Sequence, residues 1–130
     1  MSKSANNYIN IFLDDKALRK QIMGIETDST PLEEPKNPDT CNCFTLYKLL
    51  ASPEQTEAMR ANYLGGNYGY GHAKQALFEL IVEKFATVRE KYNYYINNTE
   101  EVDKLLLDGA AKAGIVASGV IKRVREKLGY

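Results

Sequence analysis

Signals that begin and end helices recur along this chain, whereas the alternation of apolar and polar residues typical of strands is nearly absent. The clearest signal is residues 52–55, where Ser52 can cap a helix, Pro53 fits the first helical position and Gln55 can complete a capping box. That helix is expected to end at Gly65-Gly66. The chain is therefore predicted to be all-α: a helical bundle with an irregular N-terminal loop segment.

Apolar residues three and four positions apart predict four further helices. The first is capped by Asp14 and ends near Gly24, with Leu18, Ile22 and Ile25 on one face. The second is short and capped by Asp39 or Thr40, with Phe44, Tyr47 and Leu50 on one face. The third is long and begins near Gly71-His72, with Leu77, Ile81, Phe85, Val88, Tyr92 and Ile96. The last follows a capping box of Asn98 and Glu101, with Val102, Leu106, Gly109, Ala113, Ala117, Val120, Val124 and Leu128. Small residues between 109 and 117 would let a neighbouring helix approach closely, so the two long helices are expected to pack as an antiparallel pair.

The charges of the chain cancel, since 17 basic residues stand against 17 acidic ones. Whole-chain charge therefore favours neither nucleic acid nor a membrane, and any RNA contact needs a local basic surface. No apolar run reaches the length of about eighteen residues that a membrane-spanning helix requires.

Cys41 and Cys43 are too close in sequence for an unstrained disulfide, and only His72 and carboxylates could join them around a metal. Free thiols in a reducing cytosol are expected.

The glycine-rich stretch 65–74 contains two glycines at the spacing of a phosphate-binding loop, but His72-Ala73 replaces the Lys-Ser/Thr pair that such a loop needs. A turn between two helices, with positive φ at several glycines, is the favoured interpretation. His72, the only histidine, is expected to make a structural hydrogen bond rather than to act in catalysis.

Six tyrosines could either stack on unpaired RNA bases or pack at the edge of the core: Tyr63, Tyr68, Tyr70, Tyr92, Tyr94 and Tyr95. The core edge is the favoured interpretation, because tyrosines at helical spacing usually line a core. Tyr94 and Tyr95 are adjacent and cannot both face it, so one of them is expected to be exposed.

Basic residues cluster locally in three places: Lys16, Arg19 and Lys20; Lys84, Arg89 and Lys91; and Lys122, Arg123, Arg125 and Lys127. Such residues suit phosphate contacts, although cations near a helix C-terminus also complement the helix macrodipole. Charge and expected exposure give five candidate RNA contacts, namely Lys74, Arg89, Lys122, Arg123 and Arg125.

Four short stretches together carry a family resemblance: Met1-Ser2-Lys3-Ser4, residues 27–39, residues 69–74 and residues 108–113. They resemble, in order, the end of the class I KMSKS loop, the linker that follows it, and two helical-domain signatures of bacterial-type tryptophanyl-tRNA synthetases. The resemblance spans essentially the whole chain. It identifies residues 1–13 as the remnant of the catalytic signature loop. Residues 14–130 would be the helical domain that binds the tRNA anticodon, with a proline-rich linker at 27–38.

The resemblance implies an enzyme that activates tryptophan with ATP and Mg and transfers it to tRNA. Lys3 would be the catalytic lysine that stabilises charge on the leaving pyrophosphate, and Met1, Ser2 and Ser4 would bind ATP with it. The first lysine of the loop and the two-histidine HIGH signature are not in this sequence, so we expect no adenylate formation by this chain alone. The implied setting is a cytoplasmic homodimer that binds tRNA, with no membrane or DNA role.

A helical protein-interaction or structural module without an RNA role is the alternative hypothesis. The zero net charge and the small-residue face of the last helix favour it. Residues 1–13 are expected to be mobile or misplaced, because their natural packing surface would lie in the nucleotide-binding part of a synthetase.

Overall fold

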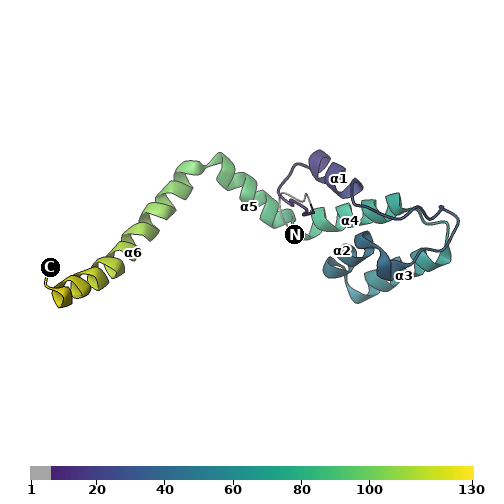
Figure 1. Ribbon diagram of the computed structural model, residues 1–130. Helices are drawn as coiled ribbons and strands as arrows, with labels where there is room; N and C mark the ends of the chain where they lie inside the picture. The colour runs from purple at the N-terminus through teal and green to yellow at the C-terminus, as the bar shows by residue number, and fades with distance from the viewer. Residues whose placement is uncertain (1–6) are drawn as a thin grey trace. The chain divides into compact units, whose positions relative to one another are not determined.

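The computed structural model describes residues 7–130, and every regular element in that range is helical (Figure 1). In chain order the elements are α1 (Asp15–Met23), the short 3-10 helix η1 (Pro38–Thr40), α2 (Asn42–Leu50), α3 (Pro53–Gly65), α4 (Tyr70–Lys84), α5 (Ala86–Asn97) and α6 (Thr99–Leu128). The predicted all-α fold class is confirmed. Met1, Ser2, Lys3 and Ser4, for which ATP contacts were predicted, lie outside the described residues.

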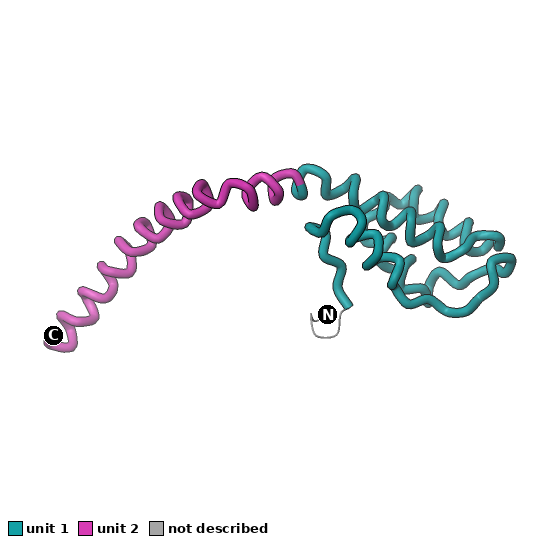
Figure 2. The backbone as a smooth tube through the Cα atoms, turned by 90° about the horizontal axis from the view of Figure 1, so that it is seen from above, with its two compact units in different colours: residues 1–89 teal, residues 90–130 magenta. Residues whose placement is uncertain are grey.

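The chain divides into two compact units, which Figure 2 colours separately. Unit 1 ends at Arg89 and contains α1, η1, α2, α3 and α4 with the first residues of α5. Unit 2, residues 90–130, contains the rest of α5 and all of α6. Among the described residues, the buried apolar core belongs entirely to unit 1.

Several predicted helix ends are confirmed by their hydrogen bonds. The carboxylate of Asp14 accepts from the Ala17 backbone N at 2.9 Å. The capping box also forms, because Ser52 Oγ accepts from the Gln55 backbone N at 3.2 Å and Gln55 Oε1 accepts from the Ser52 backbone N at 2.9 Å. Gly66 ends α3 with a φ of +72°. These features depend only on residues within one turn, so the sequence is sufficient to locate them.

Three other boundary predictions are wrong. The helix expected to be capped by Asp39 or Thr40 has Cys41 at its N-cap and begins at Asn42, because Asp39 and Thr40 belong to η1. The long helix expected from residue 71 to 96 is interrupted at Phe85, where φ is −103° and ψ is 10°. The second capping box does not form, since the Asn98 amide donates to the Tyr94 carbonyl at 2.7 Å and the Tyr94 hydroxyl donates to Glu101 at 2.8 Å.

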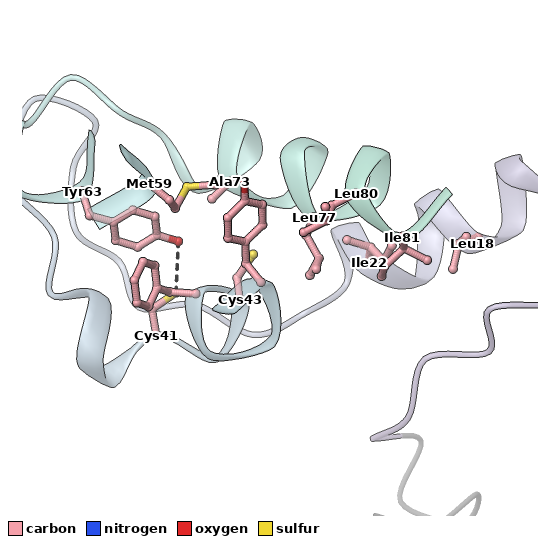
Figure 3. Packing of buried hydrophobic residues seen from close by; sticks show 12 residues of the cluster. Leu18, Ile22, Cys41, Cys43, Met59, Tyr63, Ala73, Leu77, Leu80 and Ile81 are labelled. Atoms are coloured by element: carbon pink, nitrogen blue, oxygen red, sulfur yellow. Dashed lines mark hydrogen bonds between the residues drawn. The ribbon is translucent and has the colours of Figure 1, made fainter. Parts of the chain in front are cut away.

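The core of unit 1 is built where α4 packs against α1 and α2 (Figure 3). Its buried apolar residues are Leu18, Ile22, Cys41, Cys43, Phe44, Tyr47, Met59, Tyr63, Ala73, Leu77, Leu80 and Ile81. The fully buried Tyr63 is central to the core. The centroid of its ring lies 5.5 Å from that of the Phe44 ring and 6.1 Å from that of the Tyr70 ring. Its hydroxyl lies 3.4 Å from Cys41 Sγ, the dashed line in Figure 3.

Residues 8–13 pack on this core, contrary to the expectation that the segment would lack a packing surface. Ile9, Ile11 and Leu13 are partly buried against the core cluster. Residues 10–13 form a turn, in which the Leu13 backbone N donates to the Asn10 carbonyl at 3.3 Å. The segment therefore finds its packing surface within the helical unit itself.

Helix α6 has no buried residue along its 30 positions. Large apolar side chains are exposed on it, including Leu106 at 65%, Val116 at 69% and Leu128 at 68%. The close helix packing predicted for its small-residue face is therefore not found within the described part of the chain. No helix between residues 7 and 130 combines the length and apolarity needed to cross a membrane.

Candidate nucleic-acid interface

The C-terminal end of α6 presents Lys122, Arg123, Arg125 and Lys127 to solvent, with Glu126 as the one acid among residues 122–127. The ion pair between Lys122 Nζ and Glu126 Oε1 spans 3.9 Å, and 79% of the Lys122 side chain is exposed. Such an exposed pair contributes little and leaves the cation available to a ligand. This end of α6 therefore carries an excess of three positive charges over one and a half helical turns.

These four cations lie on two sides of α6. Lys122 and Arg125 are three residues apart and share one side, where they line a surface depression with Ser118, Ile121 and Glu126. Arg123 and Lys127 are four residues apart and lie next to the apolar residues Val120 and Val124. The side with Lys122 and Arg125 therefore also carries the acid of this segment.

Lys74, another candidate RNA contact, is engaged within unit 1. Its Nζ donates to the Met23 carbonyl at 3.1 Å, and the side chain is half-buried. Met23 is the last residue of α1, so its carbonyl has no partner inside that helix. Lys74 therefore caps the C-terminus of α1 and links it to α4.

Arg89 is engaged as well. Its Nη2 donates to the Leu13 carbonyl at 2.7 Å and to Asp15 Oδ1 at 2.7 Å, and only 15% of its side chain is exposed. The guanidinium thus fixes the start of α1 to the first turn of α5, inside unit 1. Of the five candidate RNA contacts, Lys122, Arg123 and Arg125 are the exposed ones.

Sequence reasoning missed Lys36, which is 2% exposed inside the predicted linker. Its Nζ donates to the carbonyl of Pro31 at 2.7 Å, of Leu32 at 3.3 Å and of Glu34 at 3.1 Å. The ammonium also lies 5.5 Å from the centre of the Tyr70 ring. The segment is irregular, as predicted, but its backbone carbonyls surround the Lys36 ammonium and accept hydrogen bonds from it. Its proline-rich composition carries no signal for that role.

The turn between α3 and α4 is built differently from the prediction of positive φ at several glycines. Positive φ occurs at Gly66 and at Asn67, which has a φ of 55°. The Glu33 carbonyl lies against Gly66, and a carbonyl oxygen there would repel a phosphate. The His72 ring packs against that of Tyr68 at an interplanar angle of 41°, with 5.6 Å between the ring centroids.

The tyrosines divide between core and surface. Tyr63, Tyr68 and Tyr70 form an aromatic cluster in unit 1, and the Tyr68 hydroxyl donates to Met59 Sδ at 3.3 Å. Tyr94 and Tyr95 are both exposed, at 52% and 40%, and their rings contact each other at 5.3 Å. We expected one residue of this pair to be exposed, and the structure exposes both.

Both cysteines are free and buried. Burial, and then the nearby Cys41, raise the pKa of Cys43 to about 12, which keeps its thiol protonated. Residues 7–130 contain no group of three or more His, Cys, Asp or Glu side chains that could hold a metal ion.

Comparison with known proteins relates this helical chain to one class of enzyme, although no family model matches it. It is 45% identical over 129 residues to the tryptophan–tRNA ligase of Fusobacterium nucleatum, covering 99% of this chain and 39% of the relative. Identity to the ligase of Rhodopirellula baltica is 43%, covering 99% of this chain and 40% of the relative.

A solved structure gives the same result in three dimensions. The tryptophanyl-tRNA synthetase of Campylobacter jejuni superposes with a TM-score of 0.95 at 40% identity, covering 100% of this chain and 42% of that protein. A second structure of the same enzyme, in complex with ADP and tryptophan, also has a TM-score of 0.95 and is covered to 41%. The chain therefore spans about two fifths of the length of these relatives, and the matching stretch is their C-terminal part.

Proposed function

We propose that this chain, which is homologous over its whole length to the C-terminal part of the tryptophan–tRNA ligases, serves as the tRNA-binding helical part of such an enzyme. The enzyme would activate tryptophan with ATP and Mg, and transfer it to the 3′ end of its tRNA. The observation that carries the proposal is the TM-score of 0.95 over 100% of the chain at 40% identity. The C. jejuni enzyme with ADP and tryptophan supports nucleotide and tryptophan as ligands of the complete ligase.

The contacts of the described residues suggest how this part would hold tRNA. Lys122 and Arg125 share one exposed side of α6 with Glu126, which is only weakly paired with Lys122. They are suited to phosphate oxygens, which give affinity without reading sequence. Arg123 would add a further contact, whereas Lys74 and Arg89 would support the fold that presents the surface.

The rest of the proposal concerns the complete ligase. Lys3 would stabilise the charge on the leaving pyrophosphate, and Met1, Ser2 and Ser4 would border the ATP phosphates with it. Residues 1–13 would be the end of the signature loop and residues 14–130 the anticodon-binding domain. The enzyme would work in the cytoplasm as a homodimer, without binding membranes or DNA.

Salt-dependent binding to unmodified tryptophan tRNA tests the proposal. We expect binding at low ionic strength that weakens with salt, with a log–log slope of about −0.7 to −0.9 for each phosphate contact. Replacing both Lys122 and Arg125 by Gln should reduce the slope by about 1 to 2. Lys104 and Lys112, exposed cations elsewhere on α6, give the matched control when both are replaced by Gln. Negligible affinity even at low salt would refute an RNA role for this chain.

A protein-interaction module without an RNA role is the second candidate, and the exposed apolar residues of α6 favour it. If this function holds, the chain binds a protein partner. Neither the Lys122 and Arg125 substitutions nor competing tRNA should then change the affinity for that partner. ATP–pyrophosphate exchange by the chain alone is expected to stay at background, because the sequence contains one histidine and therefore no HIGH signature.

A further inference from the structure

Three cations share the exposed face of α1. Lys16, Arg19 and Lys20 are exposed, whereas Leu18 and Ile22 on the opposite face are fully buried. Lys16 precedes the other two cations by three and four positions, so all three side chains are neighbours on one helix surface. These three residues are the α1 cation cluster. Among the residues that the structure describes, no acid forms an ion pair with a member of this cluster.

The stability of α1 does not explain the cluster. Like charges at these spacings repel one another and destabilise a helix. Lys20 lies in the last turn, where a cation complements the helix macrodipole, but Lys16 lies in the first turn, where the macrodipole disfavours it. The two acids at the start of α1 have other roles, since Asp14 caps the helix and Asp15 pairs with Arg89 at 2.7 Å. A negatively charged ligand would remove the repulsion within the cluster.

Arg19 is held in place by a residue of a neighbouring helix. Helix α4 packs against α1 (Figure 1), and it carries the half-buried Gln75. Gln75 Oε1 accepts from Arg19 Nε at 3.0 Å, and Gln75 Nε2 donates to Glu79 Oε1 at 2.8 Å. Because both ends of the Gln75 amide are bonded, the amide fixes the position of the Arg19 guanidinium at the surface.

The guanidinium of Arg19 is bonded at Nε, and its two terminal amino groups point away from that bond. Within residues 7–130, no group accepts a hydrogen bond from these amino groups. Together they form the planar fork that can bind two phosphate oxygens at once. A side chain that is ordered in advance also lowers the entropy cost of binding. Lys16 and Lys20 would add two point charges beside the fork.

We propose that the α1 cation cluster is a second phosphate-binding surface for tRNA, with Gln75 as the positioning residue of Arg19. The inference rests on the proposed function, and it adds a contact in unit 1 to the one at the end of α6 in unit 2. Backbone phosphates of RNA suit the cluster because they are closely spaced anions, which lysine and arginine neutralise. Such a contact gives affinity and register without reading sequence.

Binding of unmodified tryptophan tRNA at several salt concentrations tests the surface on this chain. Lys16→Gln combined with Lys20→Gln removes two charges that repel each other, so the fold should be kept, and the thermal midpoint checks this. The log–log salt slope should fall in magnitude by about 1.4 to 1.8. The ratio of wild-type to variant affinity should then grow about tenfold when salt is lowered from about 200 mM to about 50 mM.

Lys48→Gln combined with Lys104→Gln is the matched control, because both lysines are exposed and the net charge changes equally. Both lie on helices other than α1, so the salt slope should keep its wild-type value. An equal loss of slope in this control would show a general effect of net charge and would overturn the site.

Two further outcomes separate this inference from the proposed function. If the Lys16 and Lys20 variant binds tRNA with the wild-type salt slope, the second surface is overturned and the proposed function stands. If the wild-type chain does not bind tRNA even at low salt, the proposed function is refuted, and this inference with it.

Gln75→Ala tests the positioning of Arg19 without changing any charge. Loss of the hydrogen bond should shift the NMR signal of Arg19 Nε. The affinity for tRNA should fall about two- to tenfold, because the ligand must now order one long side chain, while the salt slope stays unchanged. Arg19→Lys should also lower the affinity at an unchanged slope, since the charge remains and the fork is lost. Wild-type affinity in Gln75→Ala, with the Arg19 signal shifted, would overturn the role of Gln75.

Discussion

The backbone carbonyl of Glu33 occupies the space that a side chain at Gly66 would need, since a Cβ on Gly66 would lie 2.6 Å from that oxygen. Gly66 also has a φ of +72°, which L-residues rarely adopt. The end of α3 and the loop around Lys36 therefore meet at a point where glycine fits and larger residues do not. This contact joins a helix terminus to a loop that has no regular structure of its own.

Gly66→Ala is expected to destabilise unit 1 by about 2–4 kcal/mol, from the unfavourable φ and from the collision with a backbone atom. Urea denaturation followed by circular dichroism measures the change. Gly65→Ala is the matched control, because nothing lies within 4 Å of a Cβ there. It should be neutral or stabilising by up to about 1 kcal/mol. Equal stabilities for the two variants would contradict the proposed contact.

Lys36→Met should destabilise unit 1 by about 1–3 kcal/mol, because three carbonyls lose their donor while the apolar stem is kept. The free energy of unfolding from urea titration gives the value. Lys16→Met changes an exposed lysine on α1 in the same way and should cost less than about 0.5 kcal/mol. A similar small loss for Lys36→Met would show that water replaces the ammonium in the loop.

The stability of the loop should depend on pH through Asp28. Hydrogen bonds from Thr30 and then from Tyr70 lower its pKa below 3.8, so folding favours the carboxylate. The contribution is present above pH 3.8 and disappears as the pH falls through the lower folded-state value. Thermal midpoints should therefore differ between the wild type and Asp28→Asn at pH 6 and converge as the pH falls through the folded-state pKa of Asp28. Tyr70→Phe should reduce the difference in thermal midpoint at pH 6. A difference in thermal midpoint that is the same at all pH values would exclude the titration of Asp28 as its cause.

The elements that sequence reasoning located are those determined within a few residues. The caps at Asp14 and Ser52 use partners three positions away, so they are visible in the sequence. Gln21 binds Asn10 and Tyr8, which precede it by 11 and 13 positions. Arg89 binds the carbonyl of Leu13 and the carboxylate of Asp15, both more than 70 positions away. Such contacts exist only once helices have packed, and neither residue type signals them.

Other differences between the sequence-based predictions and the structure also arise from contacts between residues far apart in the sequence. The apolar period runs through Phe85 without a break, so nothing in the pattern marks the helix end there. Likewise, periodicity identifies the apolar face of α6 but not what covers it, and no residue of α6 is buried in this chain. For a related reason, some of the candidate RNA contacts are engaged within unit 1 and the others are exposed. Burial of Lys74 and Arg89 depends on where α1 and α5 begin and end in space, whereas the exposed end of α6 follows from the sequence.

Removal of residues 98–130 should leave the stability of unit 1 within about 1 kcal/mol, because every buried core residue lies between Leu18 and Ile81. The helix that is removed has no buried residue, so its stability depends on local propensity alone, which is marginal in water. Urea denaturation of the shortened chain measures the effect. Arg89→Ala in the shortened chain is the comparison, and it should cost about 1–3 kcal/mol through the lost contacts with Leu13 and Asp15. A loss of several kcal/mol on shortening alone would mean that α6 stabilises the core through contacts that burial does not reveal.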